Sequence, residues 1–232
     1  MAKQLAMVTG DMGGLGEAIS VKLYDAGYTV VVTYSPNNAG AETWLKRMAA
    51  DGRQFHAYAV DVGDYDSCQQ CAQQIKNEVG PVDILVNNAG ITRDASFKKR
   101  DKVNWDAVIR TNLDSAFNMT KPLCDSMVER GWGRIINVSS IIASKGGFGQ
   151  TNYAAAKAGM HGFTKSLALE GEERRDAQHD LSRIYRDQDG DCGATRTCSI
   201  PRSFRRSPSA GSGSPRRWRR SSCIYGRVRP RL

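Results

Sequence analysis

Short apolar, β-branched runs alternate with longer amphipathic stretches over the first 171 residues. The stretches between the runs carry apolar residues at helical spacing. Strands that alternate with helices form parallel sheets covered on both faces. The pattern therefore predicts an α/β fold, a doubly wound, Rossmann-like parallel sheet with helices on both faces. The runs that predict its strands are Leu5–Thr9, Thr29–Tyr34, Phe55–Val60, Val82–Val86 and Arg134–Val138.

The pattern stops near Gly171. Only 7 of the last 61 residues are Leu, Ile, Val, Met or Phe, and all 15 basic residues there are Arg. With 7 acidic residues this tail carries +8 of the chain's net charge of +9. Such a segment buries too little apolar surface to offset its ordering entropy. We therefore predict a folded domain over residues 1–171 and an anomalous tail over 172–232, with the last strands of the domain lost or illegible.

Several protein classes are disfavoured by the sequence. It holds no run of about 18 apolar residues, which a membrane-spanning helix needs. The N-terminus lacks the pattern of a signal peptide, so we expect a cytoplasmic protein. Six dispersed cysteines without a secretion signal favour reduced thiols. Cys68 and Cys71 form a C-x-x-C pair within a predicted helix, but no second pair or His cluster completes a metal site.

A glycine-rich turn follows the first strand. Residues 9–16 read T-G-D-M-G-G-L-G, and a helical segment comes next. Glycines at this place allow a tight turn and let backbone N–H groups approach a pyrophosphate at the start of the helix. The position predicts a dinucleotide site, with an ordinary strand-to-helix turn as the alternative. The candidate cofactor-binding residues of the turn are Gly10, Met12, Gly14, Leu15 and Gly16.

The end of the second strand bears on the choice of cofactor. A carboxylate there would hold the ribose 2′-hydroxyl of NAD and would repel a 2′-phosphate. Residues 33–38 read T-Y-S-P-N-N and contain no acid. We therefore expect NADP(H). No Arg stands in either turn to bind the phosphate, so Tyr34, Ser35 and Asn37 are the candidate donors, although each is also common in loops.

A second group of residues has the chemistry of carbonyl reduction. Hydride transfer to a carbonyl leaves an alkoxide that needs a proton and hydrogen-bond donors. Tyr153 and Lys157 are four residues apart in a predicted helix, so both project from one face. The nearby ammonium favours the phenolate, which makes Tyr153 a candidate general acid. A surface helix pair is the alternative, but Ser140 follows the fifth strand at the ligand edge of the sheet.

These motifs together resemble the short-chain dehydrogenase/reductase family. The T-G-x-x-x-G-x-G spacing of the turn and the N-N-A-G run at residues 87–90, after the fourth strand, carry the resemblance. It implies that Gly10, Gly14 and Gly16 line the cofactor phosphates. It also implies that Asp61 meets the adenine. The remaining cofactor candidates from the resemblance are Asn88, Ala89, Gly90, Tyr153 and Lys157.

The resemblance also assigns catalytic roles. Ser140 would hydrogen-bond the substrate carbonyl, and Tyr153 would transfer the proton. Lys157 would hold the ribose and tune Tyr153. Asn112, in the run T-N-L, would support a water-linked proton relay.

Within the family, residues 89–94, 130–135 and 147–153 resemble the acetoacetyl-CoA reductases. The implied reaction is NADPH-dependent reduction of acetoacetyl-CoA to (R)-3-hydroxybutyryl-CoA for polyhydroxybutyrate. A 3-oxoacyl-[acyl-carrier-protein] reductase is an alternative, as is a dehydrogenase of another 3-hydroxyacyl thioester or small alcohol. Asp94, Phe148 and Gln150 are candidates for the acyl pocket. Phe148 fits a core-lining role equally well and Gln150 a loop-capping role, while Gly147 stands where a glutamine is expected.

The family is usually tetrameric, so the resemblance implies a homotetramer, provided that the C-terminus is intact, and its interfaces would use the long helices Val103–Arg130 and Asn152–Glu170. The Arg-rich tail raises a competing hypothesis from another class, a nucleic-acid binder that contacts phosphates. Charge runs are more often solvated, and that hypothesis leaves the catalytic set unexplained.

A frameshift is the hypothesis that best accounts for the tail. Codons for residues 172–192 exist whose shifted frame reads V-T-L-N-T-I-S-P-G, the family's V-x-N-x-x-x-P-G turn. A second shift through residues 209–220 yields a further helix of family type. The composition, rich in Arg and free of Lys, also suits an out-of-frame reading. We therefore predict that residues 172–232 are a shifted reading of the C-terminal part of the same domain.

Overall fold

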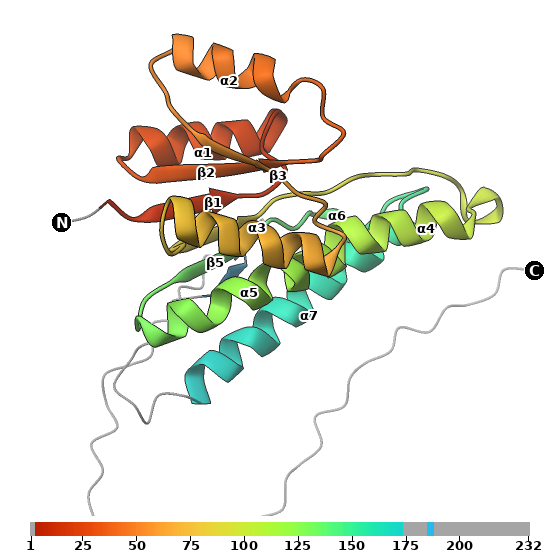
Figure 1. Cartoon of the computed structure of the whole chain (residues 1–232). Coiled ribbons are helices and arrows are strands. Elements are labelled where there is room, and N and C mark those ends of the chain that lie inside the picture. The colour runs from red at the N-terminus through yellow and green to blue at the C-terminus, as the bar shows by residue number, and fades with distance from the viewer. Residues whose placement is uncertain (1–2, 174–184, 188–232) are drawn as a thin grey trace, which may run out of the picture. The chain divides into compact units, whose positions relative to one another are not determined.

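The computed structural model describes residues 3–173 and 185–187, and its centre is a six-stranded sheet (Figure 1). Every strand pair is parallel, and the order is β3-β2-β1-β4-β5-β6. The predicted doubly wound α/β fold is thus confirmed. The strands are β1 (Leu5–Val8), β2 (Thr29–Tyr34), β3 (His56–Ala59), β4 (Ile84–Asn87), β5 (Arg134–Asn137) and β6 (Tyr185–Asp187).

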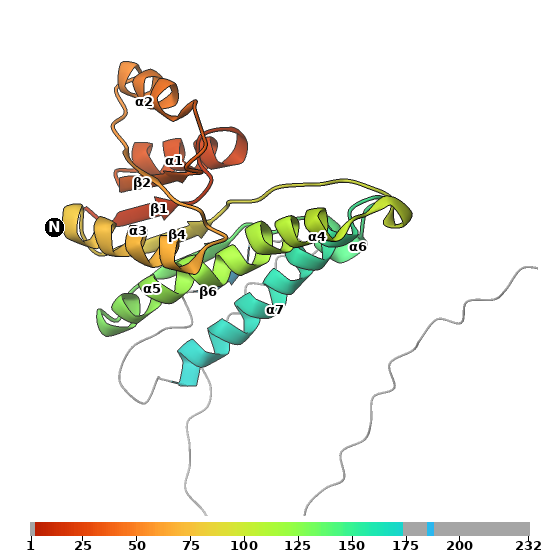
Figure 2. The same cartoon turned by 45° about the vertical axis from the view of Figure 1, so that its right-hand side comes forward.

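Helices cover both faces of the sheet. Helices α1 and α2 lie on one side, and α3, α5 and α7 lie on the other (Figures 1 and 2). Alternation along β1 shows why: Leu5 and Met7 join the core under α3 and α5, while Ala6 and Val8 join the core under α1. The helices are α1 (Gly14–Asp25), α2 (Ala41–Ala50), α3 (Tyr65–Glu78), α4 (Lys102–Ile109), α5 (Ser115–Glu129), α6 (Ile142–Lys145) and α7 (Thr151–Glu173), with a 3₁₀ turn η1 (Phe97–Lys99) and a π-helical turn η2 (Arg110–Asp114).

The prediction of one long helix over Val103–Arg130 is wrong in one respect, because its middle is not α-helical. The structure divides it into α4, the π-helical η2 and α5. The Asn112 side chain donates to the Val108 carbonyl, four residues earlier, at 2.9 Å. A local side-chain bond of this kind competes with the regular helical ladder, and π-helical turns recur at functional sites. The other predicted long helix, Asn152–Glu170, is confirmed within α7.

The structure adds a short sixth strand that the hydrophobic pattern does not show. β6 pairs in parallel with β5, with Tyr185 opposite Ile135. Its three residues include two charged ones, so no apolar run marks it. The predictions for residues 174–184 and 188–232, including the frameshift, lie outside the described residues.

The C-x-x-C pair lies in α3, as predicted, and both thiols are buried in the core. Burial raises the pKa of the Cys68 thiol to about 12 and that of Cys71 to about 11. Both therefore stay protonated at neutral pH and pack as small apolar side chains. Within residues 3–173 no group of three or more His, Cys, Asp or Glu is placed to hold a metal ion. No helix in the described part of the chain is both long and apolar enough to span a bilayer.

Candidate active site

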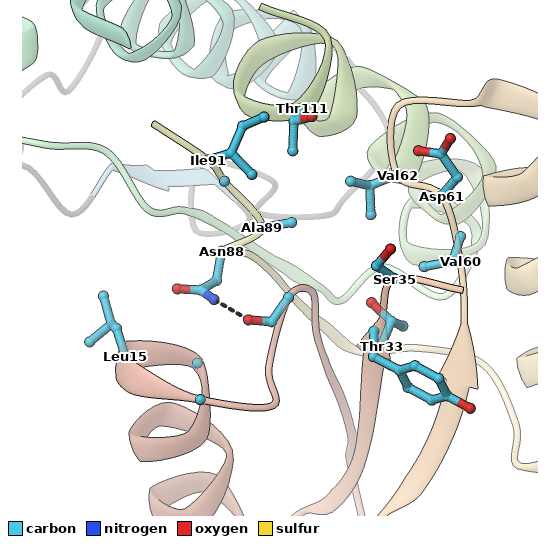
Figure 3. Close-up of a pocket in the computed structure, with 15 residues that line it drawn as sticks. Leu15, Thr33, Ser35, Val60, Asp61, Val62, Asn88, Ala89, Ile91 and Thr111 are labelled. Atoms are coloured by element: carbon cyan, nitrogen blue, oxygen red, sulfur yellow. Dashed lines mark hydrogen bonds between the residues drawn. The ribbon is translucent and has the colours of Figure 1, made fainter. Parts of the chain in front are cut away.

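A cavity of about 440 Å³ opens where β1, β2 and β4 end (Figure 3). Ligands of open parallel sheets bind at this edge, where the strand order reverses on either side of β1. Nine of the predicted cofactor residues line the cavity: Gly10, Leu15, Gly16, Tyr34, Ser35, Asp61, Asn88, Ala89 and Gly90. Gly13, Thr33, Val60, Val62, Ile91 and Thr111 complete the lining. Met12, Gly14, Tyr153 and Lys157 are not among the lining residues.

The glycine turn fits a dinucleotide because side chains would block it. A Cβ on Gly10, whose φ is +65°, would lie 2.7 Å from the Ala89 Cα. A Cβ on Gly16 would lie 2.7 Å from the Gly10 carbonyl oxygen. Helix α1 begins at Gly14 without a side-chain cap, which leaves its first N–H groups available to an anion. The turn therefore has the shape and the donors that a pyrophosphate requires.

The N-N-A-G run ties two turns of the cavity together. The Asn88 amide donates to the Gly10 and Thr9 carbonyls at 3.0 Å each, and Figure 3 shows the first of these bonds. The backbone N–H groups of Asn88 and Ala89 both donate to the Thr9 hydroxyl at 3.0 Å. The sequence reasoning missed Thr9, although a hydroxyl at the end of a strand beside a glycine turn is a usable signal. Asn88 thus fixes the turn after β4 against the turn after β1.

The side of the cavity predicted to meet the adenine is held by an ion pair. Asp61 lines the wall, and one of its carboxylate oxygens lies 2.8 Å from an Arg110 nitrogen. Arg110 also donates to the Gly63 carbonyl at 3.0 Å. The pair is about half exposed, so its role is to position the loop rather than to add much stability. Met12 lies beside the cavity, where its sulfur accepts a bond from the Asn38 amide at 3.8 Å.

The proposed catalytic residues come from η2, the segment after β5, and α7. The Lys157 ammonium lies 5.8 Å from the centre of the Tyr153 ring and donates to the Val138 carbonyl at 2.7 Å. Ser140 follows β5, and its hydroxyl accepts from the Ile142 N–H at 3.2 Å. Lys157 thus reaches the backbone of the segment after β5, two residues before Ser140.

Asn112 joins this group through Gly90. Its amide nitrogen donates to the carbonyls of Ile91 and Val108, at 2.8 and 2.9 Å. Its oxygen is buried and has no hydrogen-bond partner within residues 3–173. A Cβ on Gly90 would lie 2.5 Å from this oxygen and 3.7 Å from the Lys157 nitrogen. The structure therefore brings Asn112 and Lys157 to the same glycine, and the unpartnered oxygen fits a site for a bound water.

A second layer of polar residues fixes α7 against β5. The Ser139 hydroxyl lies 2.6 Å from the His161 Nε2 and donates to the Lys157 carbonyl at 3.3 Å. The Asn137 amide donates to the Thr164 hydroxyl at 2.8 Å. The sequence reasoning missed these residues because each pair is far apart in the chain. These hydrogen bonds fix the position of α7, which carries Tyr153 and Lys157, relative to β5.

The candidate acyl residues behave differently from one another. The Gln150 amide donates to the Asp94 carboxylate at 3.0 Å, so these two are brought together. Arg100 donates to the carbonyls of Ala95 and Gly149, which joins the two loops that carry them. Phe148 is 96% exposed, so it is not a core-lining aromatic. Its ring is therefore accessible to a ligand.

Comparison with known proteins decides the family. Residues 4–175 match the short chain dehydrogenase family. The chain belongs to the short chain dehydrogenase family. Among curated relatives, an acetoacetyl-CoA reductase of Cupriavidus necator is 52% identical over 170 residues, which cover 73% of this chain and 69% of the relative. Nodulation protein G of Azospirillum brasilense is 54% identical over the same shares. A 3-oxoacyl-[acyl-carrier-protein] reductase of Haemophilus influenzae is 41% identical, again over 73% and 69%.

As a short chain dehydrogenase, the chain is an oxidoreductase that uses a nicotinamide cofactor. The glycine turn, the uncapped start of α1 and the cavity they border are the parts that fit this cofactor. When bound, the nicotinamide exchanges a hydride with the substrate. The protein then has to supply binding, orientation and a proton.

Proposed function

We propose that the chain reduces acetoacetyl-CoA to (R)-3-hydroxybutyryl-CoA with NADPH, in polyhydroxybutyrate biosynthesis. The acetoacetyl-CoA reductases of Cupriavidus necator and Allochromatium vinosum, 52% and 49% identical, support the substrate. The observation that carries the chemistry is the meeting of Asn112 and Lys157 at Gly90, with Tyr153 one helical turn before Lys157. This arrangement suits delivery of a proton to a carbonyl that is being reduced.

Each catalytic residue has one task in the proposed mechanism. Ser140 donates a hydrogen bond to the substrate carbonyl oxygen, which stabilises the charge that develops there. Tyr153 gives its phenolic proton to that oxygen. The Lys157 ammonium favours the phenolate that remains. A water on the Asn112 oxygen then returns a proton towards Tyr153 by way of Lys157.

Asp94, Phe148 and Gln150 form the acyl side of the proposed site. The hydrogen bond between Gln150 and Asp94 fixes the loop after α6 against the segment that carries Asp94. Phe148 covers the acyl chain with its exposed ring. A Cβ on Gly147 would lie 2.7 Å from the Gln150 oxygen, so a larger side chain there would have to displace Gln150. With glycine at position 147, the Gln150 side chain can pack directly against the backbone of this loop, which a glutamine at position 147 would prevent.

NADP(H) is the proposed cofactor because no acid follows β2 at the point where the ribose would lie. Tyr34 and Ser35 line that part of the cavity and offer hydrogen-bond donors to a 2′-phosphate. In this proposal the pyrophosphate binds against Gly10, Gly14 and Gly16, with Met12 and Leu15 beside it.

The alternative substrate is a 3-oxoacyl group on an acyl carrier protein, as the name of the Haemophilus influenzae relative indicates for that protein. The deciding experiment compares turnover of acetoacetyl-CoA with that of acetoacetyl-acyl-carrier-protein, each with NADPH and with NADH. We expect the highest kcat/KM for acetoacetyl-CoA with NADPH. A higher kcat/KM for the acyl-carrier-protein substrate would favour the alternative, and no oxidation of either cofactor would refute the reductase.

A homotetramer is the proposed assembly, and α5 and α7 are its proposed contact surface. A hollow of about 370 Å³ between these helices is lined by Phe117, Phe163 and Leu167, among others. Phe117 and Leu169 are 51% and 62% exposed, so a single copy leaves apolar surface on these helices in contact with water. Burying them against a second copy is a direct use of this surface. Sedimentation analysis, with Phe117→Ser as the disrupting variant, checks the assembly.

The tail is the remaining proposal: residues 172–232 are a shifted reading of the domain's own C-terminal part. The similarity to the Cupriavidus necator relative covers 73% of this chain and 69% of that protein, so part of each lies outside the matched region. Resequencing the locus tests this, and an uninterrupted frame that reproduces residues 172–232 would refute it. A chain that carries the tail as written is expected to be poorly soluble and weakly active.

A further inference from the structure

Asp11 is a buried acid in the glycine turn that the mechanism does not use. Its side chain is 0% exposed. One carboxylate oxygen accepts a hydrogen bond from the Ser20 hydroxyl at 2.6 Å. The other is buried and has no hydrogen-bond partner in the described part of the chain. Burying a carboxylate with only one donor is costly, so this position calls for an explanation.

The groups packed around Asp11 do not compensate its charge. From α1, Glu17 adds a second negative charge nearby, although the Trp44 indole and Arg47 guanidinium of α2 hold that carboxylate. From β2, Thr33 faces the turn, and from the segment after β4, Asn88 does so; neither titrates. No ion pair involves Asp11 within residues 3–173.

This environment holds the carboxyl near a change of charge. Burial, which is the largest influence, raises the pKa of Asp11 from 3.8 to about 6, while the Ser20 bond lowers it and Glu17 raises it. The group is therefore mostly ionised above neutral pH and mostly protonated well below pH 6.

Asp11 itself stands in a turn that borders the cofactor cavity. Gly10, directly before it, and Gly13, two residues after it, both line the cavity. Its backbone N–H donates at 3.1 Å to the carbonyl of Thr33, which also lines it. The sequence places no acid after β2, but the fold brings the backbone of an acidic residue, Asp11, against the end of that strand. When Asp11 is ionised, its negative charge repels a cofactor that carries phosphates, and the poorly hydrated setting strengthens that repulsion.

We propose that Asp11 is a specificity-determining residue of the cofactor site, whose negative charge weakens dinucleotide binding and weakens NADPH more than NADH. The proposal rests on the proposed nicotinamide-dependent function. The difference between the two cofactors follows from the extra charge of the 2′-phosphate. Linkage then requires that cofactor binding draws a proton onto Asp11, so affinity rises as pH falls towards 6.

The test measures the dissociation constants of NADH and NADPH at pH 5.5 and pH 8 by fluorescence titration of the full chain. Asp11→Asn removes the charge and keeps an acceptor for Ser20, and Asp11→Ala removes both. Glu17→Gln is the matched control, because it removes a negative charge that lies nearby but is already paired. Thermal unfolding without cofactor, at both pH values, shows that each variant is folded.

At pH 8 we expect Asp11→Asn to bind NADPH about tenfold and NADH about threefold more tightly than the parent, with both gains falling below about twofold at pH 5.5. Asp11→Ala should show the same order of preference, and Glu17→Gln should change affinity by less than about twofold. Equal affinities for parent and Asp11→Asn at pH 8, or weaker binding by both Asp11 variants at both pH values, would overturn the proposal. Folded parent and variants that bind neither cofactor would instead refute the proposed function.

Discussion

Two turns border the cofactor cavity, and each buries a polar side chain with one unpartnered oxygen: the turn after β1, with Asp11, and η2, with Asn112. Both side chains are 0% exposed. Asn112 is neutral, and its amide nitrogen donates hydrogen bonds to two carbonyls. Its oxygen therefore needs only one water as a partner. Asp11 can ionise and has a single donor, so its state depends on pH. Equal burial thus gives a site whose charge does not change in η2 and a titrating site in the turn after β1.

The largest effect is expected from filling the space in the turn after β1. In Gly16→Ala the new Cβ would lie 2.7 to 2.8 Å from backbone atoms of Gly10 and Asp11, which cannot yield as a side chain would. We expect NADPH affinity to fall by about a hundredfold or more, measured by fluorescence titration. Gly162→Ala is the matched control, because nothing lies within 4 Å of its Cβ in α7. Unchanged affinity in Gly16→Ala would contradict the close packing of this turn.

The next largest effect is expected in η2, where the buried side chain, Asn112, carries no charge. Asn112→Ala leaves the carbonyls of Ile91 and Val108 without their donor. We expect a loss of roughly 2–4 kcal/mol in the free energy of unfolding, equal at pH 5 and pH 8, because no charge is involved. Urea unfolding at both pH values measures it. A loss that differs between the two pH values would break the contrast with Asp11.

In the turn after β1, replacing the buried side chain of Asp11 should raise the free energy of unfolding instead of lowering it. The pKa of Asp11 in the folded chain, about 6, lies above its ordinary value of 3.8, so ionisation of this group opposes folding. The cost is absent below about pH 4 and complete well above pH 6. Asp11→Asn should therefore stabilise the chain by roughly 1–3 kcal/mol at pH 8 and by almost nothing at pH 4. Thermal unfolding across that range checks it, and a gain that is larger at pH 4 would reverse the assignment.

The smallest effect is expected where a charge is exposed. Asp61 and Arg110 form an ion pair with about half of each side chain accessible. Asp61→Asn should change the free energy of unfolding by less than about 1 kcal/mol, and the change should shrink further in high salt. Urea unfolding in low and high salt measures it. A change as large as that of Asp11→Asn would show that burial is not what separates the two acids.

The sequence predicts the sheet well because its strands are buried on both faces and so read as apolar runs. β1, β2 and β4 alternate their side chains between two cores, and each strand lies within about two residues of its predicted bounds. The break at η2 could not be read from the pattern, because it depends on a side-chain bond from Asn112. β6 was missed because it has no apolar run of its own.

The site divides in a similar way. Spacing along one helix is enough to pair Tyr153 with Lys157, and a short motif is enough to find Asn88. Asp11 stands in the glycine motif of residues 9–16, yet its burial depends on Ser20 in α1 and Thr33 in β2. Thr9 and the pair of Ser139 with His161 likewise act across distant parts of the chain. Sequence patterns therefore reveal pairs and motifs that are close in the chain more readily than contacts between distant parts of it.

The most direct test of the proposed reductase is the oxidation of NADPH by acetoacetyl-CoA, followed by absorbance, with the protein expressed from the resequenced locus. We predict turnover by the parent and a fall in kcat of about 10²- to 10⁴-fold in Tyr153→Phe, because the proton donor is removed. NADPH affinity should stay within about twofold, since the ring and Lys157 remain. A Tyr153→Phe protein as active as the parent would contradict the proposed mechanism.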